Sequence, residues 1–160
     1  MVTWVDYRTL LARVKRNFTV LTAIRARVSG VSRWAVFFDV ENTSRAQHVD
    51  EVMRELGIAD GNRPTEFVAL GNWRVIGDDT ARLLARHGAR LVHSAPVPGV
   101  KDWSDLRIAA AAGLWLGHAR PGDRLDLVSD DRAFDAVGDV AASLGVSFRR
   151  LSYRLRSTAR

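Results

Sequence analysis

The chain has 160 residues, which suits one globular domain with a core large enough to fold alone. Its hydrophobic content of 47% with 26% charged residues is ordinary for a soluble protein, and it contains no apolar run long enough to cross a membrane. Cysteine is absent, which excludes disulfides, thiolate metal ligands and a cysteine nucleophile. Asp6 and Arg8 stand where a signal peptide would be apolar, so we expect a cytoplasmic protein with no membrane partner.

The net charge of +6 is unevenly distributed along the chain. Residues 1–33 carry seven basic side chains and one acid, and residues 146–160 carry five arginines and no acid. The middle of the chain is therefore acidic between two basic ends. This distribution suits a metal-using site that must also attract a polyanion, although exposed arginines that keep a protein soluble give the same pattern.

The first expected element is a basic amphipathic helix within residues 1–32. From about Thr3 to Val28, apolar side chains recur at alternating steps of three and four residues, and Gly30 and Ser32 end the pattern. This apolar stripe could dock on the sheet of its own chain, which we favour, or form a homodimer with a second chain. The other end of the chain, residues 153–160, is expected to be a basic tail.

Between these ends, strand patterns alternate with helix patterns. Strands are expected at residues 34–40, 65–70, 89–93, 125–129 and 146–151. Helices are expected at residues 44–56, 79–86, 102–116 and 134–144. A capping box at Ser44–Gln47 would open the first of these helices, Asp79 or Thr80 would cap the second, and glycines follow the ends of the first, second and fourth.

Strands that alternate with helices predict a parallel sheet with right-handed crossovers, here a three-layer α/β/α domain over residues 33–152. If the two most apolar strands, the first and the fourth, are neighbours, the strand order is 3-2-1-4-5. The connections then reverse direction between these two strands. Ligands of open α/β sheets bind at such a reversal, outside the carboxyl ends of the strands.

Acidic side chains stand at this predicted reversal. Asp39 ends the first strand, Asp131 follows the fourth, and Asp105 lies in the first turn of the helix expected at 102–116. Acids brought together at one edge repel one another unless a cation lies between them, so we expect a divalent-metal site. Helix capping is the alternative for Asp39, and for Asp105 it is favourable interaction with the helix dipole after an Asp102 cap.

Other polar residues near these acids have supporting roles in this interpretation. One of the two adjacent acids Asp130 and Asp131 should cap the next helix while the other points into the crevice. The remaining residues expected to support the acids are Asn42, Lys101 and Asp135, and those expected to contact a nucleic acid are Trp73, Arg74, Arg149 and Arg150. No Ser-His-Asp arrangement, histidine metal spacing or glycine-rich phosphate loop is apparent.

Four motifs together resemble the NYN branch of the PIN-like nucleases. They are Phe37-Phe-Asp39-Val-Glu41-Asn42, Gly71-Asn-Trp-Arg74, Lys101-Asp-Trp-Ser-Asp105-Leu and Leu127-Val-Ser-Asp-Asp131-Arg-Ala-Phe134-Asp135. The similarity covers about residues 34–150 in the motif order of the family, and the N-terminal segment is not part of it. The motifs at the first and fourth strands are the specific ones.

This resemblance implies a five-stranded parallel sheet and hydrolysis of RNA with Mg²⁺ or Mn²⁺. By matched position, Asp39, Asp105 and Asp131 would be the catalytic, metal-binding acids, and Asn42 would support them. Single-stranded or loop RNA is the expected substrate, because a narrow crevice accepts exposed strands more easily than a duplex. One departure matters: many relatives carry another Asp where this chain has Ala133, and Asp130 or Asp135 would have to substitute for it.

Two other functions are open. A domain that has lost full metal coordination would be an RNA-binding or protein-interaction module without catalysis. Alternatively, Asp39-Val-Glu41-Asn-Thr43 nearly spells the Asp-x-Asp-x-Thr motif of haloacid-dehalogenase-like phosphatases, with Lys101 and Asp130 or Asp131 in plausible order. Glu41 argues against the phosphatase, since the second acid of that motif is a shorter aspartate, and no cap insertion is evident.

Overall fold

The structure of the chain, a computed structural model, describes residues 32–41, 45–95 and 102–152. The expected N-terminal helix and the basic tail lie outside these residues, and so do Asn42 and Lys101. The described residues all belong to the compact unit that begins at Ser32.

Five parallel strands form one sheet. They are β1 (Trp34–Asp39), β2 (Glu66–Gly71), β3 (Arg90–His93), β4 (Arg124–Val128) and β5 (Ser147–Leu151). Their order is β3-β2-β1-β4-β5, so the predicted order and the reversal between β1 and β4 are confirmed. The three-layer α/β/α fold class is confirmed with them.

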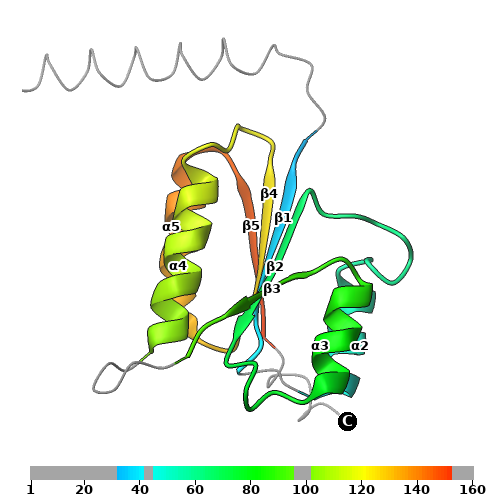
Figure 1. The fold of residues 1–160 in the computed structure, drawn as a ribbon. Coiled ribbons are helices and arrows are strands. Elements are labelled where there is room, and N and C mark those ends of the chain that lie inside the picture. Colours follow the sequence, from blue (N-terminus) through cyan, green and yellow to red (C-terminus); the bar gives the residue numbers. More distant parts are fainter. Residues whose placement is uncertain (1–31, 42–44, 96–101, 153–160) are drawn as a thin grey trace, which may run out of the picture. The chain divides into compact units, whose positions relative to one another are not determined.

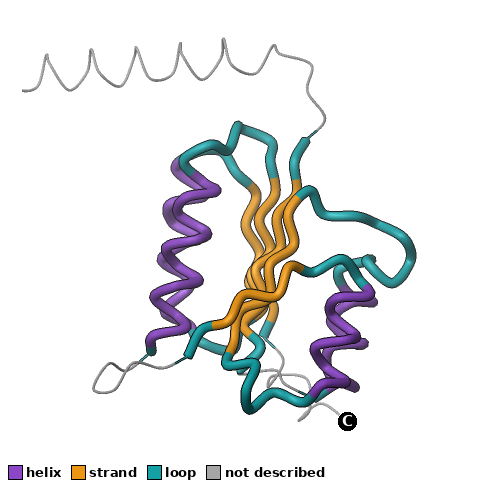
Figure 2. Tube along the Cα trace, in the orientation of Figure 1, coloured by secondary structure: helices purple, strands orange, loops and turns teal. Residues whose placement is uncertain are grey.

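Helices cover both faces of the sheet (Figures 1 and 2). Helices α2 (Ala46–Glu55) and α3 (Asp78–Arg86) lie on one face. Helices α4 (Trp103–Leu116) and α5 (Asp135–Ser143) lie on the other, and a short 3₁₀ helix, η1 (Arg132–Phe134), leads into α5. Because all five strands are parallel, the loops that follow them meet at the same edge of the sheet, its carboxyl edge.

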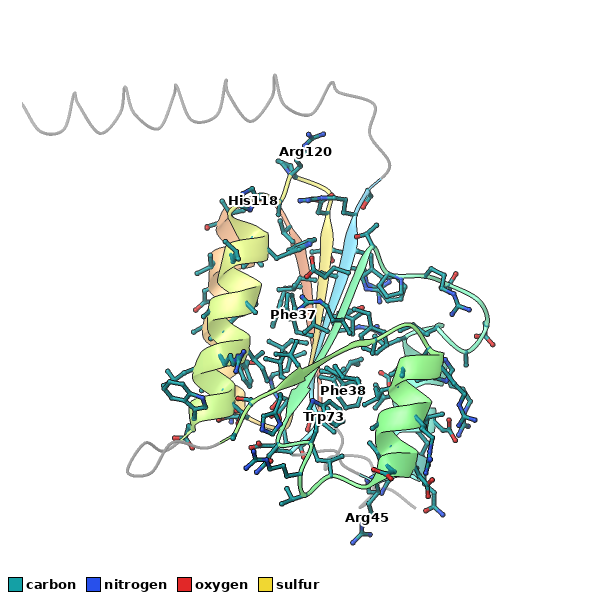
Figure 3. The ribbon with its side chains drawn as sticks, in the orientation of Figure 1. Phe37, Phe38, Arg45, Trp73, His118 and Arg120 are labelled. Carbon is teal, nitrogen blue, oxygen red and sulfur yellow. The ribbon has the colours of Figure 1, made fainter. Side chains whose placement is uncertain are left out.

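The apolar run of β1 is explained by its central position. Val36 and Phe38 pack with the side chains of α2 and α3, whereas Ala35 and Phe37 pack with those of α4. Figure 3 shows Phe37 and Phe38 on opposite sides of the sheet. Because successive side chains of a strand point to opposite faces, a strand covered on both faces is apolar along most of its length.

The predicted starts of two helices are wrong. The capping box is placed one residue too early, because α2 begins at Ala46 with Arg45 as its N-cap and no side-chain capping bond. For α3 the N-cap is Gly77, and Asp78 and Asp79 both lie inside the first turn, where carboxylates are favoured by the helix dipole. The predicted helix ends are confirmed: Gly57, Gly88 and Gly145 have positive φ angles, which glycine adopts without steric cost.

A carboxylate with three donors holds the middle of the sheet together. Asp126 of β4 is fully buried and accepts a hydrogen bond from Trp34 Nε1 at 2.8 Å. It also pairs with Arg124 at 2.6 Å and with Arg149 of β5 at 3.0 Å. The Arg124 guanidinium lies over the Trp34 ring. Arg149, expected from the sequence to contact nucleic acid, is thus bound to an acid of its own sheet.

The substitution Asp126→Asn should destabilise the domain by about 1–3 kcal/mol, because the hydrogen bonds of a charged acceptor are weakened while its burial is kept. Chemical denaturation followed by circular dichroism measures this. The matched control is Asp79→Asn, which breaks an exposed pair with Arg82 and should cost less than about 0.5 kcal/mol. Equal losses for the two variants would contradict a supporting role for Asp126.

Candidate metal centre at the carboxyl edge of the sheet

The centre of the site is the end of β1, next to the end of β4. Asp39 is the last residue of β1 and is fully buried, as is Ser129, the residue after β4. Ser129 Oγ donates a hydrogen bond to Asp39 Oδ2 at 2.9 Å, and the backbone N–H of Glu41 donates to Asp39 Oδ1 at 3.2 Å. The orientation of the Asp39 carboxylate is therefore fixed through both of its oxygens.

Ser129 also connects Asp39 to the second predicted acid. The backbone N–H of Asp131 donates to Ser129 Oγ at 3.1 Å, so one hydroxyl joins the end of β1 to the loop after β4. Sequence reasoning missed this role. A serine between a buried strand and two acids was the available signal, but only the pairing of β1 with β4 gives it a partner.

The two adjacent acids after β4 have different partners. Asp131 Oδ1 accepts the backbone N–H of Ala133 at 2.7 Å and so caps η1. Asp130 Oδ1 accepts the hydroxyl of Ser152 at 2.8 Å. The prediction that one of the pair caps the next helix is confirmed for the short helix η1, which precedes α5. The predicted division of roles is not, because Asp131 is both the cap and one of the acids that raise the pKa of Asp105.

The pKa of Asp105 shows that the other acids interact with it electrostatically. Burial, followed by the charges of Asp39, Asp131, Asp102 and Glu41, raises the pKa of Asp105 from 3.8 to about 6. These acids come from the loops after β1 and β4 and from the start of α4. The three predicted metal ligands thus belong to one electrostatic cluster, and two further acids join it.

Glu41 contributes more contacts to the site than its position in the sequence suggested. Glu41 Oε2 accepts the hydroxyl of Ser104 at 2.9 Å, and Oε1 accepts the backbone N–H of Asn72 at 3.2 Å. Its side chain thereby joins the loop after β1 to the loop after β2 and to the first turn of α4. The only sequence signal was its position two residues beyond Asp39.

Several residues expected to support the site are engaged within the fold. Asp135 accepts Arg150 Nε at 2.8 Å, and Arg150 also donates to the carbonyl oxygen of Ser129 at 3.1 Å. Trp73 packs against the core, and its Nε1 donates to the carbonyl oxygen of Val92 at 2.9 Å. Trp73 and Arg150 therefore stabilise the structure, and Arg150 holds the loop that carries the acids.

Exposed arginines lie on the loops and first turns around the acids. Arg74 follows β2, as the sequence predicted. The others were not singled out in advance: Arg132 directly follows Asp131, Arg45 precedes α2, and Arg107 lies near the start of α4. Since loops after parallel strands share one edge, these arginines lie on the same edge of the sheet as the acids. Arg107 Nη1 donates to the carbonyl oxygen of His93 at 2.8 Å.

The donor set fits a hard divalent cation bound partly through water. Carboxylate oxygens are the donors preferred by Mg²⁺, which is usually held by one or two carboxylates and several waters. Across residues 32–41, 45–95 and 102–152, no three His, Asp or Glu side chains are close enough to bind one ion directly. An ion at this edge would have to complete its coordination with water. Asp102, in the left-handed conformation with φ 55°, leads into the first turn of α4, which carries Asp105.

No family model matches the chain, and no curated protein matches it. Among the described residues, none of the helices has the length and apolar character needed to cross a membrane.

Replacing Asp105 with asparagine should make the domain more stable at high pH in the absence of divalent ions. The raised pKa of Asp105 means that the folded state holds its proton more tightly between about pH 4 and about pH 6. The stability contributed by that proton falls as the pH rises through this range and is absent above it. Asp105→Asn should therefore raise the Tm more at about pH 8 than at about pH 5.

Thermal unfolding in EDTA measures this difference, and Asp50→Asn on the exposed side of α2 is the matched control. A Tm change that is the same at both pH values would show that Asp105 is not in a cluster of like charges.

Proposed function

We propose that the domain is a metal-dependent ribonuclease that hydrolyses RNA phosphodiester bonds at the carboxyl edge of the sheet. The observation that carries this proposal is the gathering of Asp39, Asp105 and Asp131 around the reversal between β1 and β4. Folding alone does not require a partly buried acid such as Asp105 to lie near other acids whose charges add to the rise in its pKa. Such clusters are typical of sites that use the charge.

The residues that would hold the ion are Asp39, Asp105 and Asp131. A bound Mg²⁺ or Mn²⁺ would supply an acidified water for in-line attack and would offset the charge that develops on the phosphoryl oxygens. The protein contributes orientation, since Ser129 and the N–H of Glu41 fix the Asp39 carboxylate. Glu41 in turn holds the first turn of α4, and Asp105 with it, against the loops after β1 and β2.

Asp105 couples the site to pH. Because burial and neighbouring acids raise its pKa to about 6, it carries a proton in part of the population near neutral pH. A cation that binds beside Asp105 favours the ionised form, so binding releases this proton. Affinity for the ion should therefore fall as the pH drops through about 6.

RNA is the substrate supported by the motifs and by the charge around the site. The four motifs resemble those of NYN and PIN-like nucleases, and the exposed arginines Arg45, Arg74, Arg107 and Arg132 would contact phosphates on either side of the acidic cluster. Single-stranded or loop RNA fits best, because unpaired strands can enter a site bordered by loops.

The position of Ala133 favours a second candidate, an RNA-binding module without catalysis. Ala133 is exposed and contributes only its N–H, to the cap by Asp131. The two acids that could substitute for the missing aspartate are bound elsewhere, Asp130 to Ser152 and Asp135 to Arg150. The ion would then depend on Asp39, Asp105 and Asp131, with Glu41 as the nearest replacement.

The purified protein should cleave a single-stranded RNA in Mn²⁺ and should be inactive in EDTA. Asp39→Asn and Asp105→Asn should each lower the rate by about a hundredfold or more, because each removes a ligand charge. Denaturing gels measure cleavage, and the Tm of each variant shows that it is folded. Asp105→Asn is the cleaner variant, since we expect it to stabilise the fold. Asp50→Asn should keep full activity, and activity that survives both site variants would contradict the proposal.

Calorimetric titration with Mn²⁺ should show saturable binding that weakens about tenfold or more in Ser129→Ala. The reason is that the hydroxyl orients Asp39 and the loop of Asp131 without touching the ion. Ser143→Ala, at the end of α5, is the matched control. If Mn²⁺ does not bind and Asp39→Asn leaves RNA affinity unchanged, the RNA-binding module is the correct function.

A further inference from the structure

Helix α4 differs from α2 and α3 in the side chains that it exposes. The exposed positions of α2 and α3 are mostly charged or polar: Gln47, Asp50, Glu51 and Arg54 on α2, and Asp78, Asp79, Arg82 and Arg86 on α3. The exposed positions of α4 are apolar except for Arg107, whose Nη1 donates to the carbonyl oxygen of His93 after β3 at 2.8 Å. The apolar positions follow steps of three and four residues and form one surface. We call this surface the α4 stripe; it consists of Trp103, Leu106, Ala110, Gly113, Leu114 and Gly117.

The α4 stripe is too apolar for a surface in contact with water alone. Leu106 is 59% exposed and Leu114 is 71% exposed, and Val140 on the neighbouring helix α5 is also exposed. The opposite side of α4 packs against the sheet through Ile108 and Ala112. A helix that is apolar on both sides is normally buried on both sides, and an exposed apolar surface of this kind marks an interaction site.

Glycine in the stripe points to a close-packed partner. A Cβ atom added at Gly113 would meet nothing within 4 Å, so packing within the chain does not require this glycine. Glycine destabilises the interior of a helix relative to alanine, which leaves Gly113 unexplained in a single copy. Together with Ala110 and Gly117 it makes the surface flat, which allows a second helix backbone to approach closely.

The charges at the two ends of α4 indicate which partner fits. Asp102 is exposed at the N-terminal end, and Arg120 is exposed just beyond the C-terminal end, where Figure 3 labels it beside His118. Two α4 helices related by a perpendicular two-fold axis are antiparallel. This arrangement brings Asp102 of each copy towards Arg120 of the other. A parallel arrangement would bring like charges together.

We propose that the α4 stripe pairs with the same stripe of a second copy of this chain, antiparallel and centred near Ala110. This proposal does not depend on the proposed nuclease activity, because it rests on the outer side of α4 and on the charges at its two ends. Of the acidic cluster it uses Asp102, which is not one of the proposed metal ligands. The partner is the chain itself, since the surface is complementary to its own two-fold copy in shape and in charge.

Disulfide cross-linking of the full chain tests this arrangement directly, because the chain contains no cysteine. Ala110→Cys lies at the predicted axis and should form a covalent dimer on mild oxidation, since its two copies face each other. A mixture of Trp103→Cys and Gly117→Cys should give the mixed dimer, whereas Gly117→Cys alone should not cross-link. Ala85→Cys, exposed on α3, is the matched control and should stay monomeric on a non-reducing gel.

Analytical ultracentrifugation gives the second readout. Leu114→Glu should weaken the dimer about tenfold or more and leave the circular dichroism spectrum of the folded chain unchanged, because Leu114 is exposed in the single copy. A monomeric full chain would overturn the proposal. So would a dimer that survives Leu114→Glu and gives no Ala110→Cys cross-link, since its interface would lie elsewhere, for example in residues 1–31.

Discussion

Several carboxylates lie close to one another, partly or fully buried, at the ends of β1 and β4. The arrangement of the carboxyl edge has to accommodate their mutual repulsion. Asp39 is fully buried, and burial followed by the charges of neighbouring acids raises the pKa of Asp105 to about 6. A buried carboxylate loses its hydration, and each neighbouring acid adds repulsion. Hydrogen bonds from Ser129 and from the N–H of Glu41 offset part of this cost for Asp39. A cation at this edge would offset the repulsion that remains.

Asp126, a second buried acid in the same sheet, shows which partners surround a carboxylate that has a structural role. Asp126 is as buried as Asp39, but its donors include the guanidinium groups of Arg124 and Arg149. Its charge is therefore neutralised within the sheet. Asp39 accepts hydrogen bonds from a hydroxyl and an amide, and its charge adds to the rise in the pKa of Asp105. The two aspartates are equally buried, but Asp126 joins three strands of the sheet, whereas Asp39 lies at the strand end beside other acids.

The sequence predicted the features that depend on local pattern. The apolar run of β1 and the alternation of strands with helices were sufficient for the order β3-β2-β1-β4-β5, because the rules for parallel connections leave few alternatives. The acids at strand ends were found for the same reason, since carboxyl ends share an edge. The electrostatic cluster that these acids form was expected from their positions alone.

The sequence could not predict contacts made by side chains across the fold. The hydroxyl of Ser129 reaches Asp39, 90 residues away in the chain, and Glu41 reaches Ser104, 63 residues away. Arg149 and Arg150 looked like free cations of a basic end, but the pairing of β4 with β5 brings Arg149 to Asp126, and the packing of α5 on β5 brings Arg150 to Asp135. The alanines of α4 suggested close packing, although Ala110 faces outward.

Helix α4 connects the two proposals through its geometry. Its first turn carries Ser104 and Asp105, which belong to the acidic cluster, while its outer side carries the α4 stripe. An α-helix rises about 1.5 Å per residue, so an antiparallel pair of α4 helices would place the two acidic clusters at opposite ends, roughly 20 Å apart. Each cluster would then lie beside the C-terminal end of the other copy's α4, where Arg120 is exposed. A second copy of the chain would thus bring the cation of Arg120 to the border of the acidic cluster, next to Asp102.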